Sequence, residues 1–237
     1  HSPRRLDAEE FRDATLAVAG KLDLKRPAAS PAKELKMVEM RDNGPEAKVI
    51  NDQADNGVYR SVYLPLVRGV TPHNLEAFDP VEQTLVTGDR DATTVPTQSL
   101  YLLNSAFVRR HALNVATQLL AEKETTTADK IHKAYRLTLG RTATTKEIER
   151  TTKFLAEYEV AYADYLKTVK PVPPKKANPK AKLPTPKDPA QPVNPDDIDQ
   201  TGVVADEANV QPKDAQSAAW LGFVQALLGS AEYRYVK

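Results

Sequence analysis

Apolar residues recur every three or four positions along most of the chain, the spacing of amphipathic helices. The first such stripe begins after Asp7 and ends near Gly20; it consists of Phe11, Thr15, Val18 and Leu22. Asp7 suits a helix N-cap, and Glu10 follows three residues later, as in a capping box. We therefore predict a helix over this stretch.

The periodicity fades between residues 25 and 70. Prolines interrupt a polar stretch from 25 to 55, which we expect to be loop with at most short structure, such as a brief strand over 36–40. Tyrosine and β-branched residues over 57–69 favour an extended conformation, but Pro65 would remove a hydrogen bond from a central strand, so either a short edge strand or an extended segment packed on helices is expected. Next, Thr71 is expected to cap a helix of one or two turns, with Pro72 at its first position.

Three longer helices are predicted in the middle of the chain. The first runs from near Pro96 to about Ala121, with the apolar stripe Leu100, Leu103, Phe107, Ala112, Val115 and Leu119. The second runs from Thr127 to Gly140. The third follows a Thr-x-x-Glu capping box at 144–147 and extends to about Lys167. Their short connections predict antiparallel neighbours in a bundle.

Prolines then become dense, and the apolar period returns only after Asp214. The proline cluster consists of Pro171, Pro173, Pro174, Pro179, Pro184, Pro186, Pro189, Pro192 and Pro195. Proline removes backbone donors and disfavours helix at the preceding residue, which predicts an extended tether. The final stripe, Ala218, Leu221, Val224 and Leu228 with Trp220 beside it, predicts a helix that must pack on something else.

The predicted fold is mainly α: a helical bundle with long loops and at most a short extended segment, interrupted by a Pro-rich insertion. We expect a main helical domain over 1–168 and a Pro/Lys-rich tether over 169–212. A closing helix over 213–237 should dock back on the main domain. The chain starts at His1 without an initiator Met or a signal-peptide pattern, and we interpret it as a fragment of a longer protein.

Composition narrows the function. Lys plus Arg number 33 and Asp plus Glu 32, so the net charge of +1 favours neither nucleic acid nor a polybasic membrane anchor. The sequence has no cysteine, which removes disulfides, thiolate nucleophiles and covalent haem attachment from this chain. No apolar run approaches the roughly 18 residues of a membrane span. We expect no cofactor in this chain.

Motifs for catalysis are equally scarce. The histidines, His1, His73, His111 and His132, have no metal-ligand spacing, and we interpret them as structural or surface residues. The sequence contains neither Gly-x-Ser-x-Gly nor a glycine-rich phosphate loop. Whether the chain is an enzyme stays open, with the balance toward a non-enzyme.

The most unusual polar cluster spans residues 88–98, just before the predicted helix at Pro96. Arg90 could bind a carboxylate or phosphate there, with Thr93, Thr94 and Gln98 adding hydrogen bonds near the helix N-terminus. In the alternative interpretation, Thr94 is the N-cap and Arg90 pairs with a nearby acidic residue, Asp89, Asp91 or Glu82. The candidate binding residues are Arg60, Arg90, Asp91, Thr94, Gln98 and Asn104.

Two further features have more than one interpretation. Tyr158, Tyr162 and Tyr165 lie on or near one helical face, and Tyr233 and Tyr235 end the chain. Such a stripe is more typical of helix contacts than of a sugar-stacking platform. The lysines from Lys170 to Lys187 are interpreted as a solvated spacer, although they could bind an acidic partner.

Five stretches together resemble one family, a planctomycete-specific C-terminal domain of unknown function (domain of unknown function 1553). They are 4–14, 60–68, 93–105, 135–147 and 220–233, and they include Arg-Ser-Val-Tyr-Leu-Pro-Leu-Val-Arg and Thr-Thr-Val-Pro-Thr-Gln-Ser-Leu. Gly229 stands where the family commonly has Asn, which bears only on a local cap. The resemblance implies an exported parent protein that also carries a cytochrome c-like domain, so any haem would belong to those other domains.

Three functions are therefore open. The first is a non-catalytic structural or interaction module of a periplasmic, cell-surface or secreted multidomain protein. Its partners would be other domains of that parent or envelope proteins. The second is part of an enzyme acting on envelope or extracellular glycans through Arg60, Arg90, Asp91, Thr94 and Gln98. The third is a docking surface for the cytochrome c-like domain in electron transfer.

Overall fold

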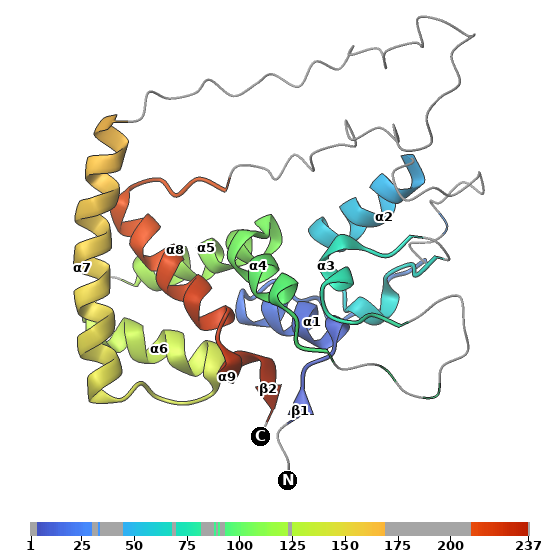
Figure 1. The fold of residues 1–237 in the computed structure, drawn as a ribbon, viewed down its shortest axis with the longest axis horizontal. Helices are drawn as coiled ribbons and strands as arrows, with labels where there is room; N and C mark the ends of the chain where they lie inside the picture. Colours follow the sequence, from blue (N-terminus) through green and yellow to red (C-terminus); the bar gives the residue numbers. More distant parts are fainter. Residues whose placement is uncertain are drawn as a thin grey trace, which may run out of the picture.

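A computed structural model of the protein describes residues 4–29, 33, 45–67, 70–81, 88, 90, 93–122, 125–168 and 210–236. This part of the chain is mostly helical, which confirms the predicted fold class (Figure 1). The longer helices are α1 (Ala8–Val18), α2 (Pro45–Asn56), α4 (Pro96–Asn104), α5 (Ala106–Ala121), α6 (Thr127–Leu139), α7 (Thr145–Thr168) and α8 (Ala215–Leu228). The short elements are β1 (Arg4–Arg5), the 3-10 turn η2 (Ser61–Tyr63), α3 (His73–Glu76), α9 (Ala231–Arg234) and β2 (Tyr235–Val236).

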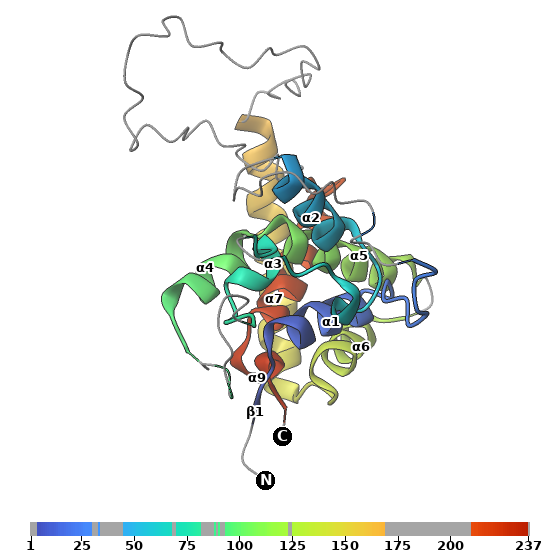
Figure 2. The same ribbon diagram turned by 90° about the vertical axis from the view of Figure 1, so that its right-hand side faces the viewer.

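Helix α8 lies at the centre of the core, where it packs against both α5 and α7. Figures 1 and 2 show α1, α2 and α3 on one side of α5 and α8, with α7 on the opposite side. The buried residues of α8 are Ala218, Ala219, Trp220, Leu221, Phe223, Val224, Gln225, Leu227 and Leu228, so more than one face is covered. Gly222 faces α7, where a Cβ would stand 3.6 Å from Phe154, an ordinary contact distance.

Both ends of the described chain meet in a two-stranded antiparallel sheet, in which Arg4 pairs with Val236 and Arg5 with Tyr235. Figure 1 shows the two termini close together at this sheet. Among the described residues, this sheet, and not the segment 57–67, therefore forms paired strands. Residues 57–67 instead contain η2 and isolated bridges from Tyr59 and Val67.

The helix predicted from Pro96 to Ala121 is wrong in one respect, because it breaks at Ser105. Ser105 is extended, with φ −62° and ψ 127°, and it ends α4 and begins α5. The change of direction turns α4 so that Leu102 is buried, while Leu100 and Leu103 are 56% and 63% exposed. The spacing of apolar residues had predicted that both leucines face the core, because it assumes one continuous helix.

Helix α2 lies where the sequence predicted a loop. Pro45 is its first residue, a position that proline tolerates because the first N–H groups of a helix need no intrahelical partner. Its buried face includes Ile50 and Ala54. The strand expected over 36–40 lies outside the described residues, as does the Pro-rich stretch 169–209, so the bounds of the tether stay a prediction. The short helix α3 begins at His73 with Pro72, not Thr71, as its N-cap.

Local capping signals predict α6 and α7 well. Gly140 ends α6 in the left-handed conformation at φ 69°, which favours glycine. At the start of α7, the Thr144 N–H and hydroxyl donate to Glu147 Oε2 at 2.7 and 2.9 Å. Arg141 lies between these two helices and donates to both Glu147 and Glu232 of α9, at 2.7–2.9 Å. The turn is thereby joined to the C-terminal end of the chain.

Within the described parts of the chain, no helix has both the length and the apolar character needed to cross a membrane.

Candidate functional site

An open groove of about 710 Å³ runs along α1. Its lining brings together residues from β1, α1, the η2 turn, the segment before α4 and β2. Among the described residues, the charged ones in this lining are Arg4, Asp7, Glu9, Glu10, Asp13, Arg60 and Arg90. Two of the candidate binding residues from the sequence, Arg60 and Arg90, therefore lie in one groove.

The carboxylates reach the groove because of their spacing on α1. Asp7 is the N-cap, and Glu9 and Glu10 lie in the first helical turn, where negative charge interacts favourably with the helix dipole. Asp13 follows Glu9 and Glu10 by four and three residues, so it lies on the same helical face. The groove therefore has an acidic wall, which the sequence analysis did not single out.

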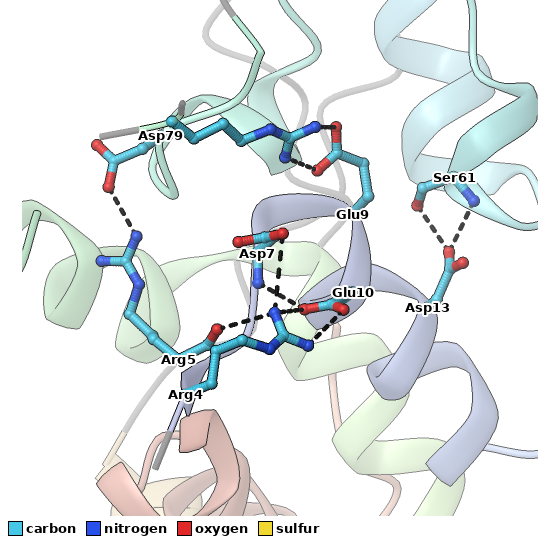
Figure 3. Close-up of polar contacts among 9 residues, drawn as sticks. Arg4, Arg5, Asp7, Glu9, Glu10, Asp13, Ser61 and Asp79 are labelled. Atoms are coloured by element: carbon cyan, nitrogen blue, oxygen red, sulfur yellow. Dashed lines mark hydrogen bonds and ion pairs between the residues drawn. The ribbon is translucent and has the colours of Figure 1, made fainter. Parts of the chain in front are cut away.

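Arginines from outside α1 hold two of these carboxylates. Arg4 donates two hydrogen bonds to Glu10, at 2.8 and 2.7 Å (Figure 3). Arg90 donates two to Glu9, at 2.7 and 3.2 Å, from a position 81 residues further along the chain. The hydrogen bond from Arg4 holds the pKa of Glu10 below its ordinary value. Glu10 is therefore ionised at neutral pH, and arginines bind both carboxylates.

Asp13 is held by the η2 turn. It accepts hydrogen bonds from the Ser61 N–H and hydroxyl, both at 2.7 Å, as Figure 3 shows. The Arg60 Nε lies 3.9 Å from the other oxygen of this carboxylate. Asp13 thus fixes the turn that forms the opposite wall of the groove.

A second polar cluster joins β1 to the segment before α4. Asp79 accepts from Arg5 at 2.8 Å and from the N–H and hydroxyl of Thr93 at 2.9 and 2.8 Å. The Thr93 carbonyl accepts from Arg5 and, at 3.0 Å, from the buried Gln98 amide. Burial alone would raise the pKa of Asp79, but the hydrogen bonds from Arg5 and Thr93 outweigh it and lower the pKa.

The candidate residues around α4 do not converge on one hollow. Gln98 is fully buried and holds the Thr93 carbonyl, whereas Thr94 and Asn104 are exposed. Thr94 is not the N-cap: that position is Val95, and no side chain caps the helix there. Asp91 lies outside the described residues. The proposed cap of α4 was wrong because Pro96 is the first helical residue, which makes Val95, and not Thr94, the residue at the N-cap position.

Arg90 also has a partner that neither interpretation of the polar cluster included. Its predicted acidic partners, Asp89, Asp91 and Glu82, lie outside the described residues, while its guanidinium binds Glu9. A pair between residues so far apart follows no local spacing rule, so only the fold reveals it.

The histidines in the described chain do not gather with other ligands. Among these residues, no group of three or more His, Cys, Asp or Glu side chains could hold a metal ion. His111 is buried beside Phe107, with ring centroids 4.6 Å apart, and burial lowers its pKa to about 4. It is therefore a neutral core residue at pH 7.

The tyrosines divide between core and surface. Tyr233 is buried beside Phe11, with ring centroids 5.9 Å apart, and its hydroxyl lies 3.3 Å from that of Thr15. On α7, Tyr158 faces Gly222 of α8, while Tyr165 is 54% exposed. Consecutive tyrosine rings on α7 have centroids 6.3 and 5.8 Å apart. The stripe thus begins as a helix contact and ends in solvent.

Comparison with known proteins identifies the family but no function. The family model PSD1, described as Protein of unknown function (DUF1553), matches residues 1–155. Neither the curated proteins nor the solved structures contain a significant match to the chain. The matched range ends within α7, and it includes the groove residues Arg4, Arg60 and Arg90. The chain therefore belongs to the DUF1553 family, as the five resembling stretches predict.

Proposed function

We propose that the chain is a non-catalytic interaction module of a larger extracytoplasmic protein and that the α1 groove binds another domain of that protein. The extracytoplasmic setting and the multidomain parent are inferred from the family resemblance described above. The binding role rests on the make-up of the groove.

The observation that supports the proposal is an apolar strip flanked by ion pairs. Val62 and Leu66 line the groove and are 67% and 38% exposed, next to the partly buried Leu64. The pairs Arg4–Glu10 and Arg90–Glu9 lie along the same groove. An apolar centre with a polar rim is the usual anatomy of a protein interface.

The same ion pairs weigh against acid–base catalysis in the groove. A general base works best with a pKa near the working pH and with a free lone pair facing the substrate. Glu9 and Glu10 are each bound by two guanidinium N–H groups, and Asp13 is bound by Ser61. These carboxylates are better suited to fix the shape of the groove than to accept a proton.

The test is a binding titration between this chain and the remaining domains of its parent protein. Val62→Asp places a charge on the apolar strip and should weaken binding at least tenfold, because a buried unpaired charge opposes association. Leu24→Asp is the matched control, since Leu24 is 74% exposed and outside the groove lining. Equal affinity of the Val62→Asp variant and the unaltered chain would refute this role for the groove.

The two other functions have less support. The groove lining includes Arg60 and Arg90 but neither Thr94 nor Gln98, so the residues expected to act on a glycan are divided. Turnover of an envelope polysaccharide by the purified chain would nevertheless overturn a non-catalytic role. For electron-transfer docking, an unchanged haem spectrum and no association with the cytochrome c-like domain would count against it.

A further inference from the structure

Arg60 also lines a second hollow, of about 360 Å³, beside residues 27–29 and the loop that follows α2. This volume falls in the roughly 300–1,000 Å³ range of small-molecule sites. Three cationic side chains line it, those of Arg12, Lys33 and Arg60, and the described residues of its lining include no carboxylate. The hollow therefore differs in charge from the α1 groove.

Arg12 gives this hollow a buried positive charge. It is 0% exposed, and it donates to the carbonyls of Ala54, Tyr59 and Gly57 at 2.9, 2.9 and 2.6 Å. A fourth bond, of 3.2 Å, goes to the Ser61 hydroxyl. All four acceptors are uncharged. These bonds orient the guanidinium without neutralising it.

Two carboxylates, Asp13 and Asp55, are partial counter-charges of Arg12. Asp13 Oδ1 lies 3.7 Å from Arg12 Nη1, beyond hydrogen-bond distance, and the same oxygen accepts both hydrogen bonds from Ser61. Its other oxygen lies 3.9 Å from Arg60. One carboxylate thus faces two arginines, and Lys33 adds a third cation at the same hollow.

The chain is shaped locally to accommodate this arginine. A Cβ at Gly57 would lie 2.3 Å from the Gln53 carbonyl oxygen, so glycine allows the chain to leave α2 at this point, beside Arg12 Nη2. The acceptor Ala54 lies in the last turn of α2, the negative end of the helix dipole. Burial favours the neutral form and lowers the pKa of Arg12, but an arginine remains charged at pH 7.

The remaining lining residues could pack against a ligand that contains a single ring. Tyr59 and Tyr63 contribute aromatic rings, and Pro27, Ala28, Ala29 and Leu64 contribute small apolar surfaces. Arg60 and Lys33 are exposed at the hollow, so both can reach a ligand from solvent. Aromatic and apolar walls with a few convergent charges are typical of small-ligand sites.

We propose that this hollow binds a small organic anion, one carboxylate or phosphate group carried on a body about the size of a single sugar ring. Arg60 and Lys33 contact the anionic group, and the buried charge of Arg12 strengthens its attraction. The tyrosines pack against the ring. This binding does not depend on the partner-binding role of the α1 groove, although Arg60 lines both.

Isothermal titration at low salt tests the site with three probes: sodium glucuronate, glucose 6-phosphate and neutral glucose. At least one anion should bind at least tenfold more tightly than glucose, and the stronger of the two identifies the anionic group. Lys33→Gln and Arg60→Gln should each weaken that binding about tenfold, because each removes one charge from the ligand's surroundings.

Matched control variants distinguish a general effect of lost positive charge from the loss of a residue that contacts the ligand. Lys153→Gln and Arg150→Gln remove the same kinds of charge from exposed positions on α7 and should leave the affinity unchanged. Arg12 is left intact, and the unfolding midpoint of each variant verifies that it is folded. The proposal is overturned if neither anion binds more tightly than glucose, or if the Lys33 and Arg60 variants bind like their controls. Because Val62 does not line this hollow, Val62→Asp tests the groove independently.

Discussion

Arg12 and Arg141 both join distant segments, but they do so by opposite means. Arg12 is wholly buried and bonds to neutral oxygens of the α2–η2 region. Arg141 is 37% exposed and bonds to the carboxylates of Glu147 and Glu232, while it also lies over the Tyr135 ring at 5.1 Å. One arginine keeps an only partly neutralised charge inside the fold, and the other is neutralised by two carboxylates near the surface.

The comparison teaches that the number of hydrogen bonds does not report the electrostatic state of an arginine. Four hydrogen bonds are described for the Arg12 guanidinium and five for that of Arg141, so the numbers are similar. Only the carboxylates cancel charge, so Arg12 can still attract an anion and Arg141 cannot attract one as strongly. Substitutions at the two sites should therefore differ in size, salt dependence and pH dependence.

The largest effect is expected from Arg12→Met. The change leaves buried carbonyls and the Ser61 hydroxyl without their donor, and it should lower the free energy of unfolding by about 3–5 kcal/mol. Urea unfolding measures this loss, which should hardly depend on salt because the site is buried. A loss below about 1 kcal/mol would mean that Arg12 is not what holds α1 to α2.

A smaller effect is expected from Arg141→Gln. Its two carboxylate pairs are bidentate but partly exposed, so the free energy of unfolding should fall by about 1–2 kcal/mol. Salt should reduce the difference between this variant and the unaltered chain, because exposed pairs are screened. Losses of equal size and equal salt dependence at Arg12 and Arg141 would break the comparison.

The pH dependence of stability should include a contribution from the protonation of Glu147. The hydrogen bond from Arg141 comes first among the causes that lower its pKa from 4.5 to about 2, followed by bonds from Thr144. Because the folded-state pKa is lower, the stabilisation is fully present above about pH 4.5 and is lost as pH falls toward 2. Glu147→Gln should flatten this part of a plot of unfolding midpoint against pH. An unchanged slope would place the acid-sensitive group elsewhere.

The smallest expected changes in the free energy of unfolding distinguish Thr144, which caps a helix, from Thr94, which does not. Thr144→Ala removes the hydroxyl that bonds to Glu147 and should lower the free energy of unfolding by about 1 kcal/mol. Thr94→Ala is the matched control, expected to change it by less than about 0.5 kcal/mol, since Thr94 is exposed and Val95 is the N-cap. Thermal unfolding of the two variants side by side gives the answer, and a larger loss at Thr94 would restore it as a cap.

Elements with local signals could be predicted from the sequence. The C-cap at Gly140 and the capping box at Thr144–Glu147 are each recognised from at most four consecutive residues, and the structure confirms both. The break at Ser105 could not be predicted, because the apolar period continues across it. It depends on how α4 packs against α5 and α8, which is a tertiary effect.

The candidate sites were harder to predict than the fold. Arg60 and Arg90 were singled out, and the groove does contain them, but the Glu9 partner of Arg90 lies 81 residues away in the sequence. Arg12 carries no sequence signal at all: a charged residue in an amphipathic helix is normally placed on the solvated face. Its burial follows from the way the loop after α2 folds over α1, which no periodicity encodes.

The central position of α8 also has a consequence for biosynthesis. A ribosome releases the chain from its N-terminus, so α1 to α7 emerge before the helix that lies between α5 and α7. Until residues 215–228 leave the exit tunnel, the surfaces that α8 covers stay open to water or to a chaperone. The nascent domain therefore completes its core only near the end of its own translation, and a chain that stops short of α8 should be a substrate for quality-control proteases.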